Sequence, residues 1–133
     1  MIAIRIIQVI AALAGLAALA LGLTFWIAQL NFIGFHLLFG LLLTLALLVM
    51  SILALSTKSL RIWGIVGIVY ALIVPIFGMT HSGILTGNLH WLIQAAHMLV
   101  SMGAGALTSI LSARYVVLKQ TTAKPSAQPQ AVR

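Results

Sequence analysis

The run GFHLLFGLLLTLALLVMSILALS, residues 34–56, contains no Lys, Arg, Asp or Glu. An apolar run of about 20 residues is long enough to cross the hydrocarbon core of a bilayer as an α-helix. Three further, mainly apolar runs occupy residues 4–28, 60–80 and 89–116. Together the four runs predict an all-α integral membrane protein.

The connections between these runs are short, which favours antiparallel packing of helices that follow each other in the chain. We therefore expect one transmembrane domain, residues 1–118, folded as an up-down-up-down four-helix bundle. In such a bundle the second and fourth helices lie on a diagonal. Residues 119–133 are polar, contain Pro and show no periodicity, so we expect them to form a flexible tail.

The charged residues are few and all basic, with seven Lys and Arg and no Asp or Glu. Mechanisms that need a carboxylate base, nucleophile or metal ligand are thereby excluded within this chain. The absence of Cys also excludes thiolate chemistry and disulfides. A net charge of +7 would suggest nucleic acid in a soluble protein. Here the charges flank apolar runs, so we expect them to set topology and to contact anionic lipid headgroups, with no nucleic acid partner.

The positions of the basic residues predict the orientation. Arg5 precedes the first run, Lys58 and Arg61 lie at the second break, and Arg114 and Lys119 close the last run, whereas the first and third breaks carry no Lys or Arg. The positive-inside rule therefore predicts that both termini and the middle connection are cytoplasmic.

Small and polar residues form one stripe on each expected helix, as is typical of helix contacts in lipid. These stripes are Gln8, Gly15, Gly22 and Gln29; His36, Gly40, Thr44 and Ser51; Gly64, Gly67, Ala71, Gly78 and His81; and His90, Gln94, His97, Ser101, Thr108 and Ser112. All four histidines belong to these stripes. We therefore expect every imidazole to face the interior of the bundle.

The histidines also share one depth in the membrane. At a helical rise of 1.5 Å per residue, His97 lies about 25 Å from Arg114, and His36 lies about 33 Å from Lys58. The four side chains are expected in one layer about 11 Å thick, in the outer half of the bilayer. The inner half offers only hydroxyls and Gln8. A continuous proton pathway across the membrane is therefore not predicted.

A cluster of histidines on facing helices suits an axial pair for haem iron or a copper or zinc site. His36 and His97, on the diagonal helices, are the predicted axial ligands. His81 and His90 are assigned to the propionate edge or to a second site. The glycines expected to give the macrocycle clearance are Gly15, Gly22, Gly40 and Gly78.

The four spans, the pattern of His36 with His90 and His97, and the glycine stripes resemble those of small bacterial b-type cytochromes with four transmembrane helices, loosely of the cytochrome b561 kind. The resemblance implies non-covalent haem b held by paired imidazoles, electron exchange with a quinone or small redox partner, and a place in the bacterial inner membrane. Two departures stand out, because the inner half of the membrane has no histidine ligand and the first helix has no His.

Two other classes of function stay open from the sequence. In one, the outer histidines bind or pass copper together with Met79 and Met98, since the thioether is a soft ligand for Cu(I). In the other, the chain is a structural or assembly subunit whose histidines only hydrogen-bond. The number of haems, one or two, the oligomeric state, including a homo-oligomer, and whether the chain is an enzyme are open as well.

Overall fold

The computed structural model describes residues 2–123, and the helices among them are those the sequence predicts. The four α-helices are α1 (Ile2–Ala28), α2 (Ile33–Leu55), α3 (Arg61–Thr80) and α4 (His90–Ala123), with short 3₁₀ helices η1 (Lys58–Leu60) and η2 (His81–Gly83). Each of the four is long and apolar enough to cross a membrane. The predicted all-α four-helix bundle is confirmed.

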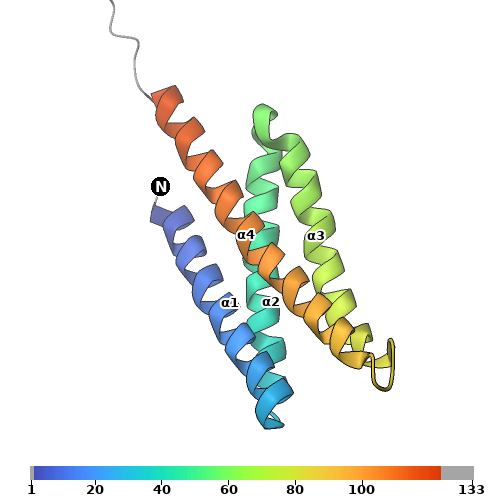
Figure 1. Cartoon of the computed structure of the whole chain (residues 1–133). Coiled ribbons are helices and arrows are strands. Elements are labelled where there is room, and N and C mark those ends of the chain that lie inside the picture. The colour runs from blue at the N-terminus through green and yellow to red at the C-terminus, as the bar shows by residue number, and fades with distance from the viewer. Residues whose placement is uncertain (1, 124–133) are drawn as a thin grey trace, which may run out of the picture.

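The helices run alternately up and down, and α2 contacts each of the other three (Figure 1). α4 crosses over α2, while α1 and α3 lie on either side of this pair. We call the end that holds residues 29–32 and 81–89 the histidine end. The opposite end, which holds Arg5, the connection 56–60 and Arg114, is the basic end. The predicted diagonal pair therefore lies at the centre of the bundle.

The C-terminus of α1 at the histidine end is closed by Gln29. This residue has a left-handed backbone, with φ of 55°, a conformation that commonly terminates helices. Its side-chain amide donates a hydrogen bond of 2.9 Å to the carbonyl oxygen of Trp26, which satisfies one acceptor that the helix leaves open. A local side chain thus ends the first span where the sequence predicts a break.

The last helix is longer than the sequence predicted. The fourth span was expected to end at residue 116, but α4 continues to Ala123. The hydroxyls of Thr121 and Thr122 donate to carbonyls one turn earlier in the same helix, and the sequence has no Gly or Pro between Gly105 and Pro125. Residues 119–123 of the predicted tail therefore belong to α4. The rest of that tail lies outside the described residues.

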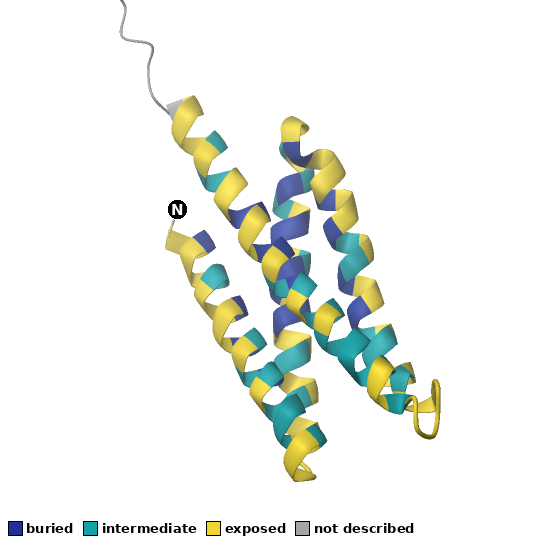
Figure 2. Cartoon of the chain, in the orientation of Figure 1, coloured by how far each residue is buried: buried dark blue, intermediate teal, exposed yellow. Residues whose placement is uncertain are grey.

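The buried core lies in the half of the bundle nearer the basic end (Figure 2). Its centre is formed by Leu47, Met50 and Leu111, none of which is exposed. The backbones of α2 and α3 approach closely at Gly64, where an added Cβ would lie 2.8 Å from two backbone atoms of α2. Small residues therefore allow tight contact, as expected for helices that associate in lipid.

The buried polar residues of the core satisfy their own hydrogen bonds. Thr44, Ser51, Thr108 and Ser112 are all buried, as their place on the predicted stripes requires. Each hydroxyl donates to the carbonyl four residues earlier in its own helix. This back-bonding removes the cost of an unpaired donor without a partner on another helix.

The packing face of α1 differs from the predicted stripe. Its buried residues are Ile4, Ala11, Ala14 and Ala18, whereas Gln8, Gly15 and Gly22 are only partly buried and Gln29 is exposed beyond the helix. The seven-residue spacing was right, but the face centres on alanines. Alanine is small enough for close contact between helices, so the glycines are not needed along the whole length.

Candidate functional site

The four histidines form one continuous row of imidazole rings near the histidine end. The ring centroids of His36 and His97 are 5.9 Å apart, with the planes tilted by 58°. His97 stacks on His81 at 4.7 Å with the planes only 7° apart, and His81 stacks on His90 at 6.4 Å. All four are partly buried. The rings come from α2, η2 and α4, and the shared layer predicted from helix lengths is present.

His36 reaches from α2 to the backbone of α1. Its Nδ1 lies 2.8 Å from the carbonyl oxygen of Ala18, and because a carbonyl can only accept, Nδ1 must carry the proton. In the neutral ring, Nε2 then keeps its lone pair. An added Cβ at Gly22 would lie 3.1 Å from Cε1 of His36. Gly22 thus lets the imidazole lie against α1.

His97 makes the corresponding contact on the other side of the bundle. An added Cβ at Gly78 of α3 would lie 3.2 Å from its Cε1. Phe77 lies against the same ring, with centroids 5.9 Å apart. Unlike His36, the ring has a buried Nδ1 without a hydrogen-bond partner among residues 2–123. A buried ring nitrogen without a partner is costly, so His97 is the imidazole whose environment is incomplete.

Backbone carbonyls hold His81 and His90, the two imidazoles at the other end of the row from His36. Nδ1 of His81 lies 2.7 Å from the oxygen of Gly78, and Nδ1 of His90 lies 3.2 Å from that of Ile84. Both rings therefore carry the proton on Nδ1 and, when neutral, a lone pair on Nε2. A proton donor at Nε2 would require either ring to be a cation.

The other residues predicted at the site have different surroundings. Gly15 meets Leu43 at ordinary contact distance and Gly40 has nothing within 4 Å of an added Cβ, so neither lies against an imidazole. Met79 is 75% exposed, so it lies largely outside the bundle, while Met98 is partly buried. Of the four predicted glycines, the structure brings two, Gly22 and Gly78, against the imidazole row.

The arrangement suits two imidazoles per metal better than three. Within residues 2–123, no group of three or more His, Cys, Asp or Glu is placed to hold a metal ion. Two imidazoles that hold one metal between them have centroids roughly 6 Å apart, because each metal–nitrogen bond is about 2 Å long. The 5.9 Å separation of His36 and His97 is close to this span, and Phe77, which cannot ligate, packs on His97 at the same separation. Nδ1–H bonded to a backbone carbonyl, as in His36, is also the usual outer contact of a ligating histidine.

The fold and the imidazole row define the class as a multi-pass, all-α membrane protein with a layer of histidines near one end of the bundle. Comparison with protein-family models, with characterised proteins and with solved structures finds no match to this chain. The cytochrome resemblance therefore gains no support from relatives. The function must be argued from the site itself.

Several contacts of the site could not be read from the sequence. The carbonyls of Ala18 and Ile84 accept hydrogen bonds from imidazoles, but a backbone acceptor leaves no signal in residue types. Tyr70 was also missed, although its hydroxyl donates a bond of 2.9 Å to the carbonyl of Val100 and ties α3 to α4 just below the row. A tyrosine on the inner face of an apolar span was the available signal, since a buried hydroxyl needs a partner.

Proposed function

We propose that this chain is a membrane electron-transfer protein that holds haem b through His36 and His97. The observation that carries the proposal is the 5.9 Å separation of these two rings on the central helices α2 and α4. The supporting chemistry is the donor set, since neutral imidazoles are ligands for haem iron. When bound, haem would supply one-electron exchange.

The residues around the two rings have distinct tasks in this proposal. The carbonyl of Ala18 fixes the tautomer and the direction of His36 through the bond to Nδ1. Gly22 and Gly78 leave each ring the room to lie flat against a neighbouring helix. These features hold two imidazoles at a set distance before any ligand arrives, which lowers the cost of binding.

His81 and His90 are proposed to contact the edge of the group or to form a second site. His81 stacks on His97 at 4.7 Å, so His81 is the imidazole nearest to a group that His97 would hold. Because Nδ1–H of both rings is already engaged, a hydrogen bond from Nε2 to a carboxylate requires the cationic imidazole. Their proposed role is therefore to bind the acidic edge, while His36 and His97 ligate.

The side of electron exchange follows from the depth of the row. All four histidines lie towards the histidine end, and the inner half of the bundle has no further imidazole. We propose that the protein exchanges electrons with a quinol or small redox partner on the non-cytoplasmic side of a bacterial inner membrane, with both termini cytoplasmic by the positive-inside rule. A reporter fused after Arg133 should then read as cytoplasmic, and one inserted at Asn88 as exported.

The absorption spectrum of the protein purified in detergent, with its metal content, tests the proposal. We expect a Soret band with sharp reduced α and β bands, lost or converted to high-spin in His36→Ala and His97→Ala. His81→Ala and His90→Ala should retain iron and mainly change its potential. Gln94→Ala, a polar change on the same face of α4, is the matched control and should leave the spectrum intact.

Three results would contradict the proposal. A purified protein that shows no Soret band after haem is supplied would contradict the proposed haem site. Bound copper without a Soret band would favour the copper-handling function. Loss of haem from His90→Ala but not from His97→Ala would exclude the proposed ligand pair.

A further inference from the structure

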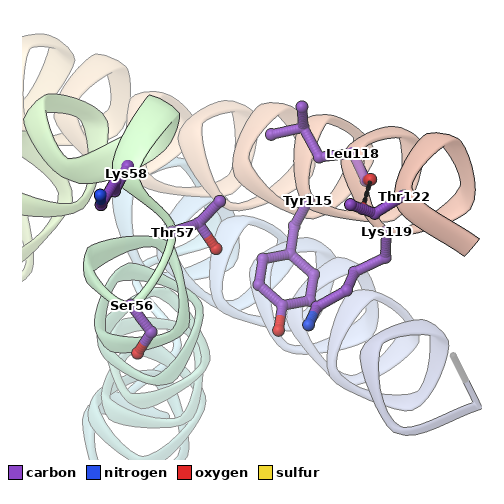
Figure 3. A pocket seen from close by; sticks show the side chains of 7 residues that line it. All are labelled: Ser56, Thr57, Lys58, Tyr115, Leu118, Lys119 and Thr122. Carbon is purple, nitrogen blue, oxygen red and sulfur yellow. Dashed lines mark hydrogen bonds between the residues drawn. The ribbon is translucent and has the colours of Figure 1, made fainter.

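A cavity of about 270 Å³ lies at the basic end, far from the imidazole row. It is formed where the chain leaves α2 and faces the last turns of α4 (Figure 3). Its lining consists of Ser56, Thr57, Lys58, Tyr115, Leu118, Lys119 and Thr122. Leu118 alone among these is aliphatic; the others carry a hydroxyl or an ammonium group. The composition is that of a site for an anion.

The positive charge of the cavity has no acidic partner in its side chains. The sequence contains no Asp or Glu, so neither Lys58 nor Lys119 can form an ion pair with another side chain of this chain. The ammonium group of Lys119 lies 5.8 Å from the centroid of the Tyr115 ring, a cation–π contact that holds the charge beside the phenol. In Figure 3 the Tyr115 hydroxyl and the Lys119 amine lie together, across from Ser56 and Thr57.

Part of the hydroxyl lining is free to donate into the cavity. Thr57 precedes η1 but makes no side-chain capping bond. Ser56 lies 3.4 Å from the carbonyl of Ile52, which is longer than a normal hydroxyl hydrogen bond. Thr122, in contrast, is committed to the carbonyl of Leu118. Two hydroxyls without a strong partner in their own helix, and two ammonium groups without an acidic side chain to pair with, therefore line the cavity.

The position of the cavity indicates where its anion comes from. α2 is apolar up to Leu55 and the cavity begins with Ser56, so the cavity lies where the hydrocarbon ends and lipid headgroups begin. Exposed apolar side chains lie beside the cavity, with Ile52, one turn inside Ser56, 51% accessible and Val117, at the level of the cavity, 56% accessible. The volume is below the roughly 300–1,000 Å³ of sites for whole drug-sized ligands. A headgroup fits the hollow while its acyl chains remain outside.

We propose that this cavity binds the phosphate group of an anionic membrane lipid. Lys58 and Lys119 supply the charge, and Tyr115, Thr57 and Ser56 donate hydrogen bonds to the phosphate oxygens. Free phosphate offers the same chemistry, and the exposed apolar surface beside the cavity favours the lipid. The site is independent of haem, because it lies at the opposite end of the bundle.

Native mass spectrometry of the full-length protein with equal amounts of phosphatidylglycerol and phosphatidylcholine tests this site. We expect the wild type to retain phosphatidylglycerol preferentially, and the double variant Lys58→Gln/Lys119→Gln to lose about thirty-fold of that preference, since each lysine near an anionic surface contributes about a five-fold effect. Tyr115→Phe, which changes no charge, should lose a smaller part.

The matched control is Arg5→Gln/Arg61→Gln, which removes the same charge at the same end, and neither arginine lines the cavity. It should keep the preference, and thermal unfolding in detergent should show all variants folded. Equal loss in both double variants would overturn the proposal in favour of general charge attraction. Displacement of the lipid by millimolar inorganic phosphate would overturn the lipid source and assign the cavity to a soluble anion.

Discussion

The two halves of the bundle are packed differently. Within the part of the chain that the structure describes, the buried residues lie in three segments, 4–18, 43–74 and 104–112, which together form the half nearer the basic end and the centre. No residue from 19 to 42 or from 75 to 103 is buried. The histidines occupy this second, more open half, where their rings contact one another and the backbone of neighbouring helices.

The difference indicates that the closed half stabilises the fold and that the open half holds the side chains suited to ligand chemistry. The buried core of the closed half is held by small residues and by hydroxyls that donate within their own helices, so the core itself offers no side chain to a ligand. The open half holds polar rings whose Nε2 atoms are not needed for the fold. Close packing leaves no room for a cofactor, so a site for one is expected where the helices are further apart. Substitutions in the two halves should therefore affect different measurements.

The largest effect is expected from Gly64→Ala in the closed half. The new methyl group would lie 2.8 Å from the backbone of Ser51 and Leu55, so α2 and α3 must separate, at a cost of about 1–3 kcal/mol or more. Unfolding by denaturing detergent, followed by helix content, measures the loss. Gly40→Ala is the control in the open half, because nothing lies within 4 Å of its added Cβ. Equal stability of the two variants would show that the close α2–α3 contact does not hold the bundle together.

An intermediate effect is expected from Gly78→Ala in the open half. The added Cβ would lie 3.2 Å from Cε1 of His97, and a ring that is only partly buried can shift by a few tenths of an ångström. We expect a stability loss below about 1 kcal/mol but a clear change in the haem spectrum under the proposed function. Gly22→Ala should act in the same way on His36. A large stability loss without a spectral change would contradict the assignment of stability to the closed half and of cofactor binding to the open half.

The smallest effect is expected from Ser112→Ala, although this serine is completely buried. Its hydroxyl donates only to the carbonyl of Thr108, which also accepts within the helix, so no partner on another helix is orphaned. A loss near 0.6 kcal/mol, the average for hydrogen bonds between membrane helices, is an upper expectation. The exposed Thr121→Ala provides the baseline in the same unfolding assay. A loss of several kcal/mol would mean that Ser112 binds a group on another helix.

The sequence predicts the position of a site residue along its helix axis better than it predicts which way the residue faces around that axis. Distance along a helix is fixed by the rise per residue, so the common depth of His36 and His97 could be predicted before the structure was known. Rotation about the helix axis is different, because apolar faces in lipid gain little from turning inward. This is why the most buried face of α1 centres on Ala11, Ala14 and Ala18, with Gly15 and Gly22 only partly buried beside it.

Residue types and their spacing by themselves determined that the chain has four apolar helices, where three of them begin and end, and at which level the imidazoles lie. These properties depend on hydropathy and length, which are local. Only the tertiary structure decided that His81 stacks on His97, that Ala18 fixes the tautomer of His36, and that Lys58 and Lys119 share one cavity. Such contacts depend on how each helix crosses its neighbours, and those crossings are set by the packing of many side chains at once.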